Sequence, residues 1–132
     1  MATELRKGRH SVTDLKIHLV CVTKYRKGVF TSEGLSCIEG SFQTVAQKMG
    51  FRVLEFHGET DHVHVVIEYP PKLSVSQIVN HLKGVSSRMY KKAGHASPHP
   101  THLWSPSYFA SSVGGASIEV LRQYIETQQK PS

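Results

Sequence analysis

Apolar residues follow two different spacings along the chain, one typical of strands and the other of helices. Alternating or continuous apolar positions rich in β-branched residues predict strands at residues 14–24, 51–57 and 61–69. Apolar residues three and four positions apart predict helices at residues 31–49 and 74–92. The first two-thirds of the chain are therefore expected to fold as strand, helix, strand, strand and helix.

Both predicted helices begin and end at residues that favour helix termini. Thr31 or Ser32 can cap the start of the first helix, and Gly50 follows its last turn. Ser74 precedes the second helix with Gln77 three residues later, which is the spacing of a capping box.

In the C-terminal third of the chain, the patterns that predict secondary structure are weaker. Residues 103–113 predict a fourth strand that Pro106 interrupts, and residues 117–129 predict a last helix. Gly114 and Gly115 are expected to form a flexible joint before that helix.

This order of elements predicts an α+β fold of the ferredoxin-like or RRM-like split βαβ type. Such a fold has a four-stranded antiparallel sheet with both helices on one face, and here a further C-terminal helix. The other face of the sheet is left open for a ligand, and in RNA-recognition domains that face stacks unpaired bases.

Composition narrows the class of protein. A length of 132 residues, with 39% apolar and 20% charged residues, is expected to form one globular domain spanning residues 1–132. No apolar stretch is long enough to cross a membrane, and residues 1–10 are too polar for a secretory signal, so we expect a cytoplasmic protein. Cys21 and Cys37 are expected to be buried, reduced thiols. The net charge of +6 favours a polyanionic partner, most simply nucleic acid.

Two histidines stand out in the third predicted strand. His62 and His64 are two positions apart, so they point to the same face of the strand, while Val63, Val65 and Ile67 point to the other. The valine face can pack under the helices while both imidazoles stand on the open face. Two neighbouring imidazoles can share one divalent cation, although a His-x-His pair alone is more often two ordinary half-exposed histidines.

The last predicted helix adds a tyrosine and a glutamine. Tyr124 and Gln128 are one turn apart beside an apolar stripe of Ile118, Leu121 and Ile125, and can therefore face a site at the edge of the buried surface. A phenol can act as a covalent nucleophile, and an amide oxygen can complete a His-His-Gln ligand set. The sequence contains no P-loop, no G-x-S-x-G elbow and no H-E-x-x-H helix that would indicate other chemistry.

Taken together, these residues resemble the HUH endonuclease superfamily, and within it the single-tyrosine transposases of the insertion-sequence 200/605 class. The resemblance spans nearly the whole chain. It is carried by His62-Val63-His64, Asn80-His81-Leu82-Lys83-Gly84-Val85-Ser86-Ser87-Arg88, Leu103-Trp104-Ser105-Pro106-Ser107-Tyr108-Phe109 and Tyr124-Ile125-Glu126-Thr127-Gln128. Thr127 departs from the tyrosine–lysine pairing of the related relaxases.

The resemblance implies an enzyme that cuts and rejoins single-stranded DNA hairpins at element ends through a 5′-phosphotyrosine. Tyr124 would be the nucleophile, and His62, His64 and Gln128 would hold Mg²⁺ or Mn²⁺. Imidazoles alone would also suit zinc, and spacing does not decide the metal. The resemblance further implies a homodimer whose active sites are completed in trans, with Gly114 and Gly115 as the hinge, in the nucleoid of a bacterium or archaeon.

DNA contacts are expected from basic residues around the open face. The candidates are Arg6, Lys7, Arg9, Lys24, Arg26, Lys27, Lys83 and Arg88. Two alternatives remain open at this stage. One is a non-catalytic single-stranded nucleic-acid-binding module on the same sheet, and the other is a domesticated relative that processes palindromes without moving an element.

Overall fold

The computed structural model describes residues 5–113 and 118–128, with the backbone alone for residues 118–122. Its elements, in chain order, are β1 (Arg6–Lys7), β2 (Val12–Thr13), β3 (Lys16–Val22), the short 3₁₀ helix η1 (Lys24–Arg26), α1 (Ser32–Met49), β4 (Arg52–Gly58), β5 (His62–Glu68), α2 (Val75–Lys92), β6 (Phe109–Ser112) and α3 (Ile118–Thr127).

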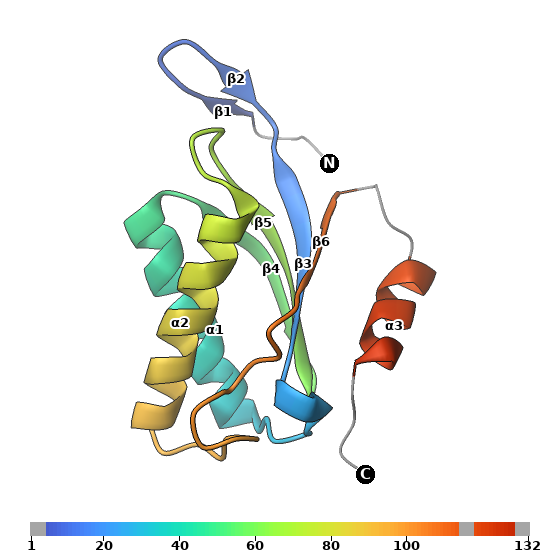
Figure 1. Ribbon diagram of the computed structural model, residues 1–132. Helices are drawn as coiled ribbons and strands as arrows, with labels where there is room; N and C mark the ends of the chain where they lie inside the picture. Colours follow the sequence, from blue (N-terminus) through green and yellow to red (C-terminus); the bar gives the residue numbers. More distant parts are fainter. Residues whose placement is uncertain (1–4, 114–117, 129–132) are drawn as a thin grey trace.

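The main sheet has four antiparallel strands in the order β4-β5-β3-β6. Helices α1 and α2 cover one face of this sheet, and α3 lies on the opposite side (Figure 1). This is the split βαβ arrangement predicted from the order of the elements.

Strands β3 and β5 direct alternate apolar residues toward α1 and α2. Leu19, Val63, Val65 and Ile67 are fully buried and belong to the core that these two helices share with the sheet. Alternate residues of the same strands point to the other face, because successive side chains of a strand alternate. This alternation places the two predicted metal ligands away from the helices.

The predicted helix caps are confirmed. The Thr31 hydroxyl accepts a hydrogen bond from the backbone N–H of Gly34 at 3.1 Å. Gly50, with φ of +85°, ends α1 in the left-handed region that glycine adopts without strain. Ser74 and Gln77 form the reciprocal capping box at the start of α2, with bonds of 3.1 and 2.9 Å.

The N-terminal hairpin β1-β2 was not predicted from the sequence. It is attached to the main sheet by Arg6, which donates to both carboxylate oxygens of Glu68 at 2.7 Å. Arg52 donates to the same carboxylate at 3.1 Å, and the Glu68 side chain is fully buried. Two short strands in a basic segment have too little apolar pattern to be recognised without this ion pair.

The fourth strand is shorter than predicted. Regular pairing covers only Phe109–Ser112, because Pro106 lacks the N–H that a ladder needs. Upstream, Trp104 forms an isolated bridge with Thr23 and donates its indole N–H to the Ser86 hydroxyl at 2.9 Å. The predicted Gly114-Gly115 joint lies outside the described residues.

Both cysteines are free, with Cys21 buried and Cys37 only partly so, which corrects the expectation of two buried thiols. Among the described helices, none is both long and apolar enough to cross a bilayer.

Candidate active site

His62 and His64 project from the same face of β5, as predicted. In the antiparallel register they lie opposite Val22 and Val20 of β3, so all four side chains share the face that α1 and α2 leave uncovered. Val63, between the two histidines, is fully buried on the helix side. The strand thus presents two imidazoles side by side from a rigid central position in the sheet.

His62 is oriented by a carboxylate that the sequence analysis did not single out. The Nδ1 atom of His62 lies 2.8 Å from Oδ1 of Asp61, and Arg26 donates to the other carboxylate oxygen at 3.0 Å. Burial alone would raise the pKa of Asp61, but hydrogen bonds from His62 and Arg26 outweigh it and hold that pKa below its usual range. An ionised carboxylate on Nδ1 directs Nε2 of His62 outward, which is how carboxylates commonly orient metal-binding histidines.

His64 lies against a further histidine of β3. Its Nε2 atom is 3.0 Å from Nδ1 of His18, and the ring of His57 on β4 lies 6.4 Å away between centroids. Burial, followed by the nearby His18 and His57, lowers the pKa of His64 and favours the neutral imidazole that binds metals. His18 and His57 occupy polar alternate positions of their strands, but only the strand register shows that they lie close to His64.

Tyr124 and Gln128 are held by two serines of the segment that leads into β6. The Tyr124 hydroxyl lies 2.9 Å from the Ser107 hydroxyl, and its ring is 5.4 Å from that of Phe109. The Oε1 atom of Gln128 accepts hydrogen bonds from Ser107 at 3.3 Å and from Ser105 at 3.4 Å. Burial raises the pKa of Tyr124, and the bond to Ser107 opposes this only in part.

The structure therefore contains two groups of predicted site residues rather than one. Val20 of β3 pairs with Phe109 on one side and His64 on the other, so β3 separates the histidines from the tyrosine side of the sheet. Within residues 5–113 and 118–128, no hydrogen bond or ring contact joins Tyr124 or Gln128 to His62 or His64. Arg26 connects the histidine group with the tyrosine group, because it pairs with Asp61 beside His62 and its guanidinium nitrogen also lies 3.8 Å from a carboxylate oxygen of Glu126 on α3.

The proposed donor atoms differ in how well they are placed for a divalent cation. Nε2 of His62 can ligate such a cation, since Nδ1 of that ring is engaged by Asp61, whereas Nε2 of His64 would first have to leave Nδ1 of His18, 3.0 Å away. Gln128 instead lies with the serines in this arrangement. In the part of the chain that the structure describes, no three His, Cys, Asp or Glu residues converge as a metal site. The histidine pair thus fits part of a coordination shell.

The predicted DNA-contact residues have varied surroundings. Lys83 donates to the backbone carbonyls of Ser105 and Ser107 at 2.7 and 2.8 Å, and Arg6 is paired with Glu68. Lys7 and Arg88 are exposed. Lys83 and Arg6 therefore support the protein's own structure, while their role in DNA binding stays a prediction.

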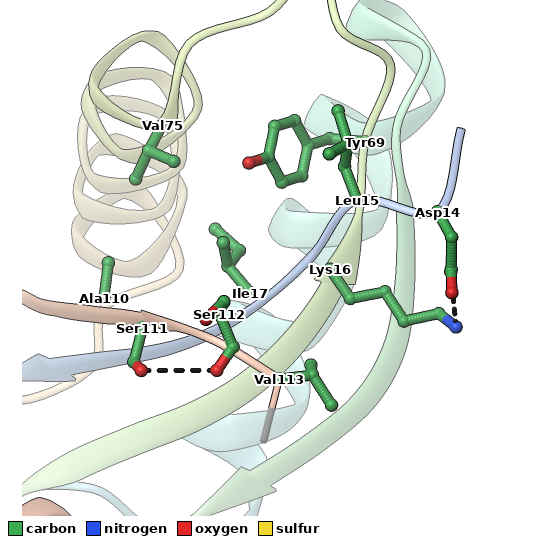
Figure 2. Close-up of a pocket in the computed structure, with 10 residues that line it drawn as sticks. All are labelled: Asp14, Leu15, Lys16, Ile17, Tyr69, Val75, Ala110, Ser111, Ser112 and Val113. Atoms are coloured by element: carbon green, nitrogen blue, oxygen red, sulfur yellow. Dashed lines mark hydrogen bonds and ion pairs between the residues drawn. The ribbon is translucent and has the colours of Figure 1, made fainter. Parts of the chain in front are cut away.

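Two of the cavities among the described residues lie along or beside β3. The larger, of about 530 Å³, is at the other end of β3 from η1 (Figure 2), and the residues that line it include none of the predicted site residues. A smaller one, of about 220 Å³, lies between η1 and the end of α3 and is partly lined by Gln128.

Two solved structures that this chain resembles are described as transposases. The chain superimposes with a TM-score of 0.83 on the crystal structure of a Deinococcus radiodurans protein assigned as a transposase, at 29% identity, covering 96% of this chain and 99% of the other. It also matches a REP-associated tyrosine transposase bound to a REP hairpin, with a TM-score of 0.58 and 10% identity, covering 93% and 69% of the two chains. At that identity the second likeness concerns the fold alone.

Sequence comparison gives the family. The profile described as "Transposase IS200 like" matches residues 11–128. The ISDra2 transposase TnpA of Deinococcus radiodurans is 30% identical over 95% of this chain and 91% of its own length. The IS200 transposase of Salmonella typhimurium is 30% identical over 90% of this chain and 80% of its own. The chain belongs to the IS200-like transposase family, which confirms the predicted resemblance and assigns it to DNA transposition.

Proposed function

We propose that this transposase cleaves and rejoins single-stranded DNA at insertion-sequence ends, with Tyr124 as the nucleophile. His62, His64 and Gln128 would hold a divalent cation, most simply Mg²⁺ and alternatively Mn²⁺. The observation that carries the proposal is the placement of His62 and His64 on one sheet face, with Asp61 orienting His62. A passive nucleic-acid binder has no use for such a pair combined with a helix-borne tyrosine.

The reaction conserves the energy of the phosphodiester. The Tyr124 phenolate oxygen forms a bond to phosphorus as the bond to the 3′ oxygen breaks, and the proton lost by the phenol is balanced by the one that the 3′ oxygen gains. The 5′-phosphotyrosine can then be attacked by a second 3′-hydroxyl, which reverses the same exchange on a new strand. A bound cation would offset the charge that builds up on the phosphate oxygens.

The separation of the two groups by β3 requires that α3 move for catalysis. The Ser107–Tyr124 hydrogen bond would be exchanged for contact with DNA, and Gln128 would leave the serines to join the histidines. Helix α3 could reach the histidines of its own chain or those of a second copy. In a homodimer the second route completes each site in trans, with the segment that contains Gly114 and Gly115 as the hinge.

The substrate proposed is a single-stranded hairpin at the element end. Support comes from membership of the IS200-like transposase family and from the net charge of +6. A tyrosine transposase that shares only the fold has been solved bound to a REP hairpin. The proposed setting is the nucleoid of a bacterium or archaeon.

A covalent-adduct gel tests the proposal. Labelled single-stranded hairpin DNA is incubated with the protein and Mg²⁺ or Mn²⁺ and separated under denaturing conditions. We expect a protein–DNA adduct that is absent in Tyr124→Phe, in His62→Ala and after chelation, but retained in the matched control Tyr108→Phe. Binding of the hairpin without an adduct under either metal would support the non-catalytic alternative instead.

A further inference from the structure

A small polar pocket lies where η1 meets the last turn of α3, next to the proposed nucleophile and apart from the histidine pair. Its volume is about 220 Å³. Figure 1 shows the C-terminal end of α3 turned toward the short helix that follows β3. The lining residues are Thr23, Lys24, Tyr25, Arg26, Ser105, Pro106, Thr127 and Gln128.

The backbone on one side of this pocket is strained. Tyr25 has φ of +60° and ψ of +14°, and Arg26 has φ of +54°, so two successive non-glycine residues adopt the left-handed region. Thr23 holds the turn in place, since its carbonyl accepts from the Arg26 N–H at 2.9 Å and its hydroxyl donates to the Lys27 carbonyl at 2.8 Å. Strain of this kind is concentrated at functional sites, where the surrounding structure maintains it.

The strained backbone presents an aromatic ring to solvent. Tyr25 is 40% exposed, and its ring lies 5.1 Å from the Lys24 ammonium and 6.3 Å, edge to face, from the ring of His99. Neither contact buries the ring, so packing does not explain a tyrosine at a position that Asn or Gly would occupy at lower cost.

The walls of the pocket combine the groups that unpaired nucleic acid requires. Tyr25 offers a flat aromatic surface and Pro106 an apolar one. Lys24 provides positive charge, while the charge of Arg26 is paired with Asp61 at 3.0 Å. Ser105, Thr127 and Gln128 offer hydrogen-bonding groups. Stacking on an aromatic side chain within a basic groove is the usual way in which proteins hold single-stranded bases.

We propose that this pocket receives one unpaired nucleobase of the strand whose phosphate reaches Tyr124, with the Tyr25 ring stacked on the base. The choice of a single-stranded DNA ligand rests on the proposed function. The pocket exists while α3 lies against Ser105 and Ser107, before the movement proposed for cleavage. Gln128 lies about one helical turn, or about 5.4 Å, from Tyr124, so a base held here brings the strand close to Tyr124 before α3 moves. The strained turn then serves to point the ring into the strand's path.

Binding of short single-stranded oligonucleotides tests the proposal without chemistry. All variants are made in the Tyr124→Phe background and measured by fluorescence anisotropy in the presence of a chelator, so the result is independent of whether the adduct forms. We expect Tyr25→Asn to weaken binding by about five- to a hundredfold, and Tyr25→Phe, which keeps the ring, to stay within about twofold. Met89→Asn is the matched control, because Met89 on α2 is 38% exposed and lies on the helix-covered side of the sheet.

Two further readouts separate a stacking role from a structural one. The melting temperature of Tyr25→Asn is expected to equal or exceed that of its parent, because Asn tolerates the left-handed backbone better than Tyr. An abasic site scanned along the oligonucleotide should weaken binding at one position, and that loss should vanish in Tyr25→Asn. The proposal would be overturned by unchanged binding of Tyr25→Asn, or by an abasic penalty that is equal in both proteins at every position. A loss of binding that is explained by a lower melting temperature of Tyr25→Asn would also overturn it, because Tyr25 would then have a structural role.

Discussion

The Asp61 carboxylate is hydrogen-bonded to His62, its neighbour in sequence, with Oδ1 2.8 Å from Nδ1 of the imidazole. Its other oxygen accepts from Arg26 at 3.0 Å, and Arg26 also lies 3.8 Å from Glu126 on α3. One carboxylate and one guanidinium therefore connect the histidine strand with the helix that carries the tyrosine. The orientation of His62 depends on this connection as well as on β5 itself.

Replacing Asp61 by Asn should weaken metal binding and so raise the Mn²⁺ concentration that DNA cleavage requires. The Asn amide lacks the negative charge with which Asp61 orients His62 and makes the imidazole a stronger base. Loss of such a partner typically costs about 10- to 100-fold in metal affinity. The measurement is adduct yield against Mn²⁺ concentration. Asp14→Asn serves as the control, because Asp14 is exposed and pairs with Lys16 away from the histidines. An unchanged Mn²⁺ curve for Asp61→Asn would remove Asp61 from the site.

Lys83 is expected to act through the segment that it holds. Its ammonium binds the carbonyls of Ser105 and Ser107, whose side chains contact Tyr124 and Gln128. Lys83→Met keeps the length but removes these charged hydrogen bonds, and should cost about 2 kcal/mol in the free energy of unfolding together with a lower rate of adduct formation. Urea unfolding and the adduct gel measure the two effects. Lys72→Met, in an exposed loop, should change neither; equal behaviour of the two variants would contradict the prediction.

Stability should fall in acid because of Glu68. Hydrogen bonds from Arg6, which outweigh the effect of burial, and from Arg52 lower the pKa of this carboxylate. A depressed pKa means that the stabilising ion pair is present above the pH at which a free glutamate titrates, about 4.3, and is lost as the pH falls through the lower folded-state value. Removing the charge should cost about 2 kcal/mol at neutral pH.

The measurement for Glu68 compares the free energy of unfolding of wild type and Glu68→Gln at pH 7 and pH 3. The wild type should lose more stability between these values, so that the two proteins converge in acid. A constant difference at both pH values would show that the ion pair does not contribute in this way.

The two thiols should differ in reactivity. Burial raises the pKa of Cys21 to about 11, against an opposing effect of Lys83, and its side chain has no exposed surface. Cys37 on α1 is only partly buried. In native protein, iodoacetamide should modify Cys37 first and Cys21 only after unfolding, as read by mass spectrometry of the peptides. Equal labelling rates in native protein would indicate that β3 opens readily.

Much of the fold follows from local patterns. The alternation in β3 and β5, the helical spacing in α1 and α2, and the caps at Thr31 and Ser74 are interactions between residues close in sequence, and they could be predicted. The β1-β2 hairpin could not be, because it depends on Arg6 meeting Glu68 from 62 positions away. Pro106 shortens the fourth strand and is visible in the sequence, but the packing of the segment before it, where Trp104 donates to Ser86 of α2, depends on the tertiary structure.

The candidate site likewise combines features that follow from local strand geometry with contacts that follow from packing. That His62 and His64 share a face is a consequence of strand geometry, and membership of the family agrees with the motifs that suggested it. Register and packing decide the remaining contacts. They place His18 and His57 beside His64 and bring Arg26 to Asp61, which holds His62. They also bring the two serines to Tyr124 and Gln128. Side chains brought together from different strands and helices have no fixed spacing along the chain, so their contacts arise only when the sheet has formed.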